Sequence, residues 1–474
     1  MRPRVLLWSA MLAWAAGFSA LSILRHRAFN TGRFDLGNMV QAVWSTAHGH
    51  PLEVTTLAGE QISRLGSHFD PILIAFAPLW LAWPSPGVLL VAQAAAIALG
   101  ALPVFWLTRR HLGSERAGLG FALAYLLYPA TQWLTLNEFH AVALACPLLL
   151  YAFWFLDQDR LLPFAVFAAL AAISKEEIGL VVAGFGIWYA FARRRRVVGA
   201  VIAVLGAGVA IVAVEVVVPH FSGSASSFYR RYDEVGGSPG GIAGTLFTDP
   251  LRVLGEAFSG RDLHYLGQLL LPLGALAILA PLALIAVLPE LTLNLLSGAP
   301  TQSSIHFHYT AGLIPPLVVA TVLGAAGLAR RRPAVLPWLG PAAVALGLAA
   351  NFHLGAIPVW GHLPGGEDFQ TNAAEVTEHD RITLEAVRLI PPRAVVSANN
   401  WLGGHLSARM RVLSFPRLSD ATWVAVDETR PSYLDGFSPL PAATALRNLR
   451  RNPDWRVVFE RDGVVVLRRK TSQR

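Results

Sequence analysis

Residues 86–108 read PGVLLVAQAAAIALGALPVFWLT and run directly into Arg109 and Arg110. The stretch has no charged residue, and it is longer than the roughly 20 residues that an α-helix needs to cross the hydrocarbon core of a bilayer. Cytoplasmic connectors of membrane proteins carry an excess of arginine and lysine, so the two arginines mark the cytoplasmic end. The sequence therefore predicts a membrane-spanning helix that runs inward.

The composition of the whole chain agrees with this prediction. Of the 474 residues, 54% are hydrophobic and only 14% are charged, against about 25% charged in soluble domains. Mean hydropathy is +0.48. The formal net charge is +8, but the basic residues cluster at the ends of apolar blocks, so no nucleic-acid partner is expected. Cys146 is the single cysteine, which excludes an internal disulfide.

Arginine clusters fall on alternate connectors between the apolar blocks, which predicts a cytoplasmic N-terminus. The clusters are Arg2 and Arg4, then Arg109, Arg110 and Arg116, then Arg193 to Arg196, and then Arg330 to Arg332. The predicted spans are residues 5–24, 86–108, 117–134, 141–156, 161–174, 177–192, 197–218, 309–329 and 334–356. Parity requires an even number of crossings within 264–297, where Pro281 is expected to separate two short spans. We therefore predict about eleven spans.

This topology divides the chain into two domains. Residues 1–358 form a predicted transmembrane domain with external loops at 25–84 and 219–263, and residues 359–474 form a small external α/β domain. In the latter, a helix is expected over 380–390 and strands over 394–397, 423–426, 455–459 and 464–467. Asp462-Gly463 between the last two strands predicts a hairpin. The predicted fold class is an α-helical polytopic membrane protein with external juxtamembrane helices and a C-terminal α/β domain.

The segment after the first span carries an acid at the start of an amphipathic helix. Leu36, Met39, Val40, Val43 and Trp44 repeat at helical spacing, which predicts a helix lying on the membrane surface. The residue before this series is Asp35. Its carboxylate either caps the helix or faces a substrate held at the bilayer surface.

A second external segment brings His68 and Asp70 together before Pro71. The apolar run that follows ends at Trp83, which is too short to span a bilayer, so a juxtamembrane or re-entrant helix is expected. Asp70 followed by proline is also an ordinary helix start, in which the acid serves only as a cap. A chemical role and a structural role both remain open for this acid.

Further ionisable residues are predicted to lie at the same outer face, by the parity of the spans. They are Glu138 and His140 in one connector, Lys175, Glu176 and Glu177 in another, and His306, His308 and Tyr309 before an inward span. Such residues often mark only the edge of the membrane, but a short connector holds them against protein or a cavity. Glu290 falls inside a predicted span, where a carboxylate is costly and therefore a functional candidate.

The sequence resembles a family of bacterial multi-pass membrane proteins known as domain of unknown function two thousand and seventy-nine. The resemblance rests on Phe34-Asp35-Leu36-Gly37, His68-Phe69-Asp70-Pro71, Leu127-Tyr128-Pro129, Glu138-Phe139-His140, Lys175-Glu176, and His308-Tyr309 with Pro315. It covers most of the chain. The family is similar in plan to the GT-C glycosyltransferases, integral enzymes that move a sugar from a polyprenyl-phosphate carrier to an acceptor outside the cytoplasmic membrane.

The resemblance implies a location, a reaction and a set of roles. The protein is expected in the bacterial cytoplasmic membrane, with membrane lipid, a polyprenyl-phosphate sugar donor and an unidentified acceptor as partners. Asp35 is the expected general base, with Glu138 and Asp70 as secondary acids. These three are also the candidate ligands of a possible divalent metal, Mg²⁺ or Mn²⁺. The expected substrate-binding residues are Arg33, His68, His140, Lys175, Glu176, His308 and Tyr309, with Lys175, His308 and the arginines assigned to phosphate.

Two other function classes compete with sugar transfer. A transporter or flippase of a lipid-linked or polar solute is favoured by Glu290 and by the prolines and glycines inside the spans. It is disfavoured because the ionisable residues gather at one face and no inverted repeat is visible. A non-catalytic scaffold, whose external tail binds a partner, is the third interpretation.

Overall fold

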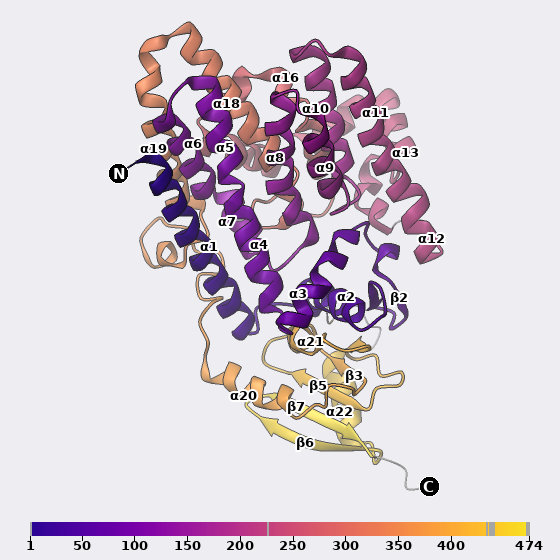
Figure 1. The fold of residues 1–474 in the computed structure, drawn as a ribbon. Helices are drawn as coiled ribbons and strands as arrows, with labels where there is room; N and C mark the ends of the chain where they lie inside the picture. Colours follow the sequence, from indigo (N-terminus) through magenta and orange to yellow (C-terminus); the bar gives the residue numbers. More distant parts are fainter. Residues whose placement is uncertain (1, 225–226, 433–434, 436–440, 471–474) are drawn as a thin grey trace.

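The computed structural model describes residues 2–224, 227–432, 435 and 441–470. Its main body is a bundle of helices, and a small domain that contains the longer strands lies at one end of that bundle (Figure 1). The N-terminus lies beside the bundle, whereas the C-terminus lies at the far end of the small domain. The predicted fold class, a polytopic helical protein with a C-terminal α/β domain, is confirmed.

Five helices within the described residues are long and apolar enough to cross a membrane. They are α1 (Pro3–Arg27), α4 with α5 (Gly87–Leu99 and Ala101–Leu112), α11 with η5 and α12 (Arg196–Val212, Ala213–Val217 and Val218–Ser222), α18 (Ile314–Arg331), and η10 with α19 (Pro333–Val335 and Leu336–Leu354). Each of them overlaps one of the predicted spans. The α4–α5 helix contains the stretch that ends in Arg109 and Arg110.

Shorter apolar helices fill the remaining predicted spans up to residue 192. They are α6 (Glu115–Leu127), α7 (Pro129–Leu136), η4 (Ala141–Leu144), α8 (Ala145–Asp157), α9 (Leu161–Ala172) and α10 (Ile178–Ala192). The predicted span 117–134 is divided because Pro129 forces Tyr128 into an extended conformation, with φ −63° and ψ 121°. The total number of complete crossings therefore stays a prediction.

The segment from 264 to 297 folds as a hairpin of short helices. They are α15 (Gly260–Leu270), η7 (Leu271–Leu273), η8 (Leu276–Leu279), α16 (Pro281–Leu284) and α17 (Leu288–Leu295). The chain reverses at Gly274 and Ala275, which have φ values of 66° and 53°. Asn294 Nδ2 donates to the Tyr265 hydroxyl across the open end. The reversal precedes Pro281, and the helical segment does break at this proline, since Ala280 is non-helical and Pro281 begins α16.

The predicted polar loop 219–263 is largely helical, which corrects the sequence interpretation. It contains the end of α12, then η6 (Ser227–Val235), α13 (Pro239–Thr248), α14 (Pro250–Ala257) and the start of α15. The described side chains Ser238, Asp249 and Ser259 each accept a hydrogen bond from a backbone N–H of the helix that follows. These polar residues are helix caps, and this explains a composition that resembles that of a loop.

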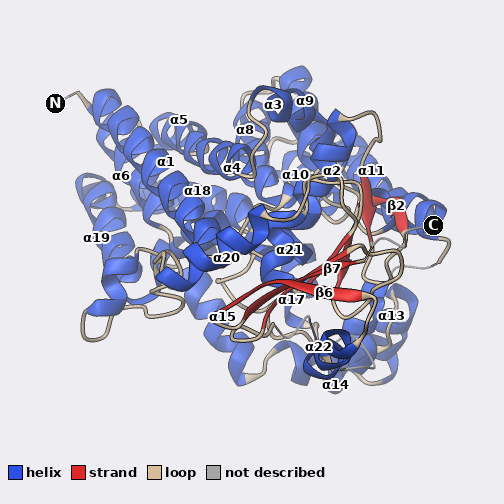
Figure 2. Ribbon diagram, turned by 90° about the horizontal axis from the view of Figure 1, so that it is seen from below, coloured by secondary structure: helices blue, strands red, loops and turns tan. Residues whose placement is uncertain are grey.

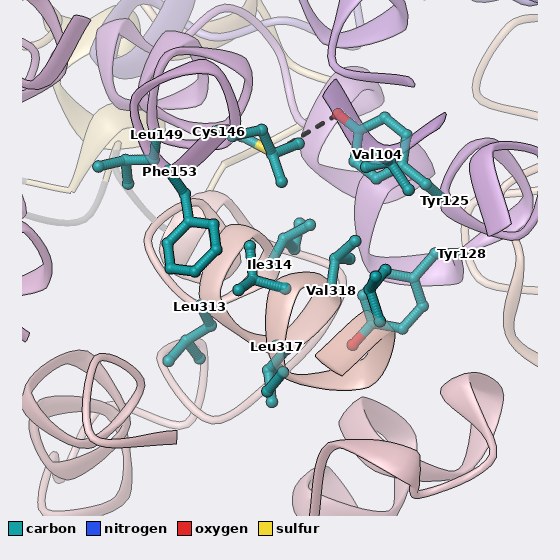
Figure 3. Close-up of a cluster of buried hydrophobic side chains, with 14 of the residues drawn as sticks. Val104, Tyr125, Tyr128, Cys146, Leu149, Phe153, Leu313, Ile314, Leu317 and Val318 are labelled. Atoms are coloured by element: carbon teal, nitrogen blue, oxygen red, sulfur yellow. Dashed lines mark hydrogen bonds between the residues drawn. The ribbon is translucent and has the colours of Figure 1, made fainter. Parts of the chain in front are cut away.

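The core of the bundle forms around α18. Figure 3 shows Ile314, Leu317 and Val318 of this helix among buried side chains of α5, α6 and α8. Cys146 is buried there, with its Sγ 3.6 Å from the Tyr125 hydroxyl. Cys146 therefore packs in the core of the bundle.

The small domain is a five-stranded sheet with helices on both faces. Its strands are β3 (Val396–Ala398), β4 (Val412–Ser414), β5 (Trp423–Asp427), β6 (Trp455–Arg461) and β7 (Val464–Arg469), in the order β4-β3-β5-β7-β6. The helices are α20 (Glu378–Arg388), α21 (Asn400–Leu406) and α22 (Ala442–Arg451). One face packs on α20 and α21 and the other on α22 (Figure 2). The hairpin at Asp462-Gly463 is confirmed, with both residues at positive φ.

A layer of short elements joins the bundle to the small domain (Figure 1). It comprises η1 (Arg33–Gly37), α2 (Asn38–Ala47), β1 (Glu53–Thr55), β2 (Gln61–Ser63), η2 (Arg64–Gly66), η3 (Pro71–Phe76) and α3 (Ala77–Ala82). The predicted amphipathic helix is α2, whose apolar residues Met39, Val40 and Val43 are buried. α21 packs so closely on η1 that a Cβ on Gly37 would lie 2.5 Å from the Ser407 hydroxyl.

Candidate functional site

A cavity of about 630 Å³ lies where this joining layer meets the bundle. Its lining comes from η1, the loop before η3, the α7–η4 and α9–α10 connectors, α11–α12, α17 and the loop before α18. A volume of this size is typical of a small-molecule site. Seven of the predicted site residues line it: Asp35, His68, His140, Lys175, Glu176, His308 and Tyr309.

Asp35 faces the cavity from η1, a π-helical turn that begins directly after Gly32. Its side chain is 43% exposed, and no side chain of the turn makes a capping bond. The structural alternative for this acid, a helix cap, is therefore wrong. Wide turns of this kind are frequent at functional sites because they reorient a side chain.

A pair of stacked imidazoles stands behind Asp35. His140 Nε2 lies 3.3 Å from Asp35 Oδ1, and His140 Nδ1 lies 2.8 Å from the Asn137 carbonyl oxygen. The His140 ring stacks on that of His308, with centroids 3.7 Å apart. Burial disfavours the charged carboxylate, but the bond to His140 and the charges of His140 and Arg64 outweigh it and lower the pKa of Asp35. Asp35 is thus an anion at neutral pH.

Glu138 lies behind this wall and outside the cavity lining. Its carboxylate accepts hydrogen bonds from Gly32 N at 3.0 Å and from Leu36 N at 2.8 Å. Its backbone has a φ of 54°, a costly conformation for a residue with a side chain. Burial and the charge of Asp35 raise the pKa of Glu138 to about 8. This acid therefore holds the turn that presents Asp35.

Asp70 also lies outside the cavity lining. It occupies the expected position before Pro71 but makes no capping bond. Instead, Arg64 Nε donates to Asp70 Oδ2 at 2.7 Å, and the two side chains are 5% and 2% exposed, respectively. Arg64 in turn lines the cavity. The acid thus orients a cation that faces the site.

Two further ion pairs come from the α9–α10 connector. His68 Nδ1 lies 2.9 Å from Glu176 Oε1, and Lys175 Nζ lies 2.6 Å from Glu177 Oε1. Burial disfavours the Glu176 anion, but the positive charge of His68 outweighs it and lowers the pKa of Glu176 to about 2. Burial also disfavours the Lys175 cation, but the carboxylates of Glu177 and Glu176 raise its pKa above the usual value. The wall is therefore densely charged at neutral pH.

Arg231 completes the positive lining and is a residue that the sequence analysis did not single out. Its Nη1 donates to the Tyr309 hydroxyl at 3.2 Å and to Gln302 Oε1 at 3.3 Å. Arg64 was missed in the same way. Arg64 and Arg231 lie in connecting segments where the spacing of apolar residues predicts no particular structure. Their position at the cavity is therefore seen only in the three-dimensional structure.

Arg33 does not join the cavity lining. Its guanidinium donates to Val412 O, Thr55 O and the Ser414 hydroxyl at distances of 2.7–2.8 Å. Although Arg33 is adjacent to Asp35 in sequence, it turns the other way and fastens η1 to the edge strand β4. Its predicted role as a phosphate partner has no support in this position.

Residues 25–466 match the family described as "Predicted membrane protein (DUF2079)". The chain belongs to this family. Among solved structures, the apo state of ArnT from Cupriavidus metallidurans is similar over 96% of this chain and 98% of its own, at 13% sequence identity and a TM-score of 0.49. No curated protein matches the chain.

The three acids proposed as ligands of a divalent metal do not fit that role in this family member. Glu138 is held by backbone N–H groups and Asp70 by Arg64, so of these three acids Asp35 alone lines the cavity. Among the described residues, no group of three histidine, cysteine or acidic side chains is arranged to hold a metal ion. A metal requirement therefore stays a prediction without geometric support.

Proposed function

We propose that this protein is a membrane glycosyltransferase that moves a sugar from a polyprenyl-phosphate donor to an acceptor at the outer face of the cytoplasmic membrane. The observation that carries the proposal is the cavity at the small-domain end of the bundle. There, one exposed carboxylate, Asp35, shares a lining with the cations Arg64, Lys175 and Arg231. Transfer from a phosphate carrier needs both kinds of group in one place.

In the proposed reaction Asp35 is the general base. As the acceptor oxygen bonds to the anomeric carbon of the donor, its proton passes to the Asp35 carboxylate. The bond from that carbon to the phosphate oxygen breaks, and its electron pair leaves with the phosphate. Lys175 and Arg231 stabilise the developing negative charge. The configuration at the anomeric carbon inverts in such a single displacement.

One wall of the cavity suits a donor whose tail stays in lipid. Val214 and Val218 line the cavity from the α11–α12 helix. On the same helix, Ile211 and Val216 are exposed apolar residues, as expected for a surface that meets lipid. A polyprenyl chain can lie against this helix while its phosphate and sugar reach the cavity. This arrangement supports a lipid-linked donor over a freely soluble one.

The direct test uses purified protein in lipid nanodiscs and a panel of radiolabelled polyprenyl-phosphate hexoses. The proposal expects release of free polyprenyl phosphate by the wild-type protein, at a rate that increases with added acceptor. Asp35→Asn should lower the rate by about 10²–10⁴-fold, the usual contribution of a general base. Binding of every donor in the panel without cleavage would contradict the proposal.

The same assay separates the competing function classes. A flippase or transporter moves the labelled donor across the bilayer intact, so label would change sides without appearance of free polyprenyl phosphate. A scaffold would neither cleave nor move it. Against transport, the charged side chains gather around one cavity at one end of the bundle, and Glu290 lines that same cavity.

A further inference from the structure

Helix α17 presents two hydrogen-bond acceptors to the cavity from one face. Glu290 and Asn294 are four residues apart on this helix, so their side chains project in the same direction. Both line the cavity. Neither was given a role in the proposed transfer, in which the base and the phosphate partners come from other segments.

Protein groups leave these acceptors incompletely paired. Glu290 is only 4% exposed, and its Oε2 has no hydrogen-bond partner. Asn294 Nδ2 donates to the Tyr265 hydroxyl at 3.2 Å and to the Tyr309 carbonyl at 2.9 Å. Both bonds are made by the amide nitrogen, so the amide oxygen is the group of Asn294 that can accept from a ligand in the cavity. Buried acceptors are normally paired, so an unpaired carboxylate oxygen beside a cavity points to a donor supplied by a ligand.

The charges around α17 restrict what that ligand can be. Lys175 and Arg231 flank the Tyr309 ring, at 5.3 Å and 5.6 Å from its centre. Their positive charges disfavour a cationic ligand at this end of the cavity. The Glu177 carboxylate lies 2.6 Å from Lys175 Nζ and offsets that positive charge, so an anion gains little directly beside α17. A neutral group rich in hydroxyls satisfies both conditions, because each hydroxyl can donate to an acceptor and accept from Lys175.

We infer that the α17 end of the cavity is the subsite for the donor's sugar ring, and that this ring is an uncharged hexose whose neighbouring hydroxyls donate to Glu290 and Asn294. This inference rests on the proposed glycosyl transfer and names its substrate class. Gly312 is part of the subsite, since a Cβ there would lie 2.7 Å from Glu290 Oε2 and displace the carboxylate. Specificity then arises because a donor without the matching hydroxyl leaves a buried carboxylate unpaired.

The test combines a change in the protein with a change in the sugar. Kinetics are measured with undecaprenyl-phosphate glucose, mannose and galactose, and then with monodeoxy analogues of the hexose that is turned over best. In wild-type protein one deoxy analogue should lose about tenfold or more in kcat/KM. In Glu290→Gln the natural donor should lose a similar factor, mainly through KM, and the penalty for that analogue should largely disappear.

Controls separate this inference from the proposed function. Glu256→Gln removes an exposed carboxylate on neighbouring α14 and should leave both the natural donor and the deoxy penalty unchanged. Glu290→Asp is the second variant, used if the glutamine variant does not fold. Wild-type turnover with an undiminished deoxy penalty in the Glu290 variants would overturn the subsite alone. Absence of binding and turnover of all three hexoses by wild-type protein would overturn the proposed function and the subsite together.

Discussion

The cavity wall around Asp35 and the connector behind it use the same functional group in opposite ways. Asp35 lines the cavity, and within the described residues its carboxylate has a hydrogen bond to the side chain of His140. Glu138 is covered by protein and bonded to the backbone N–H groups of the turn that carries Asp35. The difference shows that a carboxylate is available for chemistry only when its oxygens are not already hydrogen-bonded within the protein. The oxygens of Glu138 accept from backbone N–H groups, and Asp70 Oδ2 accepts from Arg64.

The largest expected effect on activity belongs to Asp35→Asn. Because this side chain is exposed to the cavity and the amide oxygen of asparagine can still accept from His140, the variant should fold as the wild type does and lose about 10²–10⁴-fold in transfer rate. Thermal unfolding in detergent, followed by tryptophan fluorescence, should give an unchanged midpoint. A large drop in that midpoint would mean that Asp35, like Glu138 and Asp70, stabilises the fold.

Asp70→Asn should give the largest loss of stability. It leaves the Arg64 guanidinium buried without its counter-charge, which costs about 3 kcal/mol. The matched control is Asp420→Asn, which breaks a more exposed pair with Arg411 at 2.9 Å and should cost less than about 1 kcal/mol. Equal shifts in the unfolding midpoints of the two variants would contradict the structural role of Asp70.

Glu138→Gln should have an intermediate effect. The amide keeps one oxygen but sets an NH₂ group against backbone N–H donors, so about 1–3 kcal/mol of stability should be lost. Activity should fall with it, because the turn that carries Asp35 loosens. If Glu138→Gln kept its stability but lost all activity, Glu138 would have to act in catalysis rather than in holding the turn.

The helical fold and the position of the site followed from the sequence because each depends on local signals. Apolar length predicts the long helices, and the spacing of Met39, Val40 and Val43 predicts α2. Parity of the arginine clusters assigned Lys175 and His308 to the same end, and they do line one cavity. Residue type, periodicity and parity suffice to predict which of these side chains lie at the same end of the helical bundle.

The direction in which each side chain points did not follow from the sequence. Arg33 and Asp35 are two residues apart, yet one binds the small domain and the other faces the cavity. That divergence depends on α21, whose Asn400 Oδ1 accepts from Phe34 N across hundreds of residues of sequence. Arg231 was missed for the same reason, since its partners Gln302 and Tyr309 come from a distant loop.

The smallest expected effect is a shift in the pH dependence of activity when His140 is replaced. It tests whether the cavity-facing acid Asp35 is the group that must be ionised. Asp35 works as a base only when ionised, so activity falls as pH drops through its pKa, which His140 holds below the usual carboxyl value. In His140→Phe the hydrogen bond is lost while burial remains, so the pKa of Asp35 should rise and the acid limb of the kcat/KM profile should move to higher pH.

His308→Phe is the control because the hydrogen bonds of His308 go to Asn137 and not to Asp35. If the acid limb stays in place in His140→Phe, the limb belongs to a group other than Asp35. If the limb shifts in both variants, the stacked pair of histidines as a whole sets the pKa.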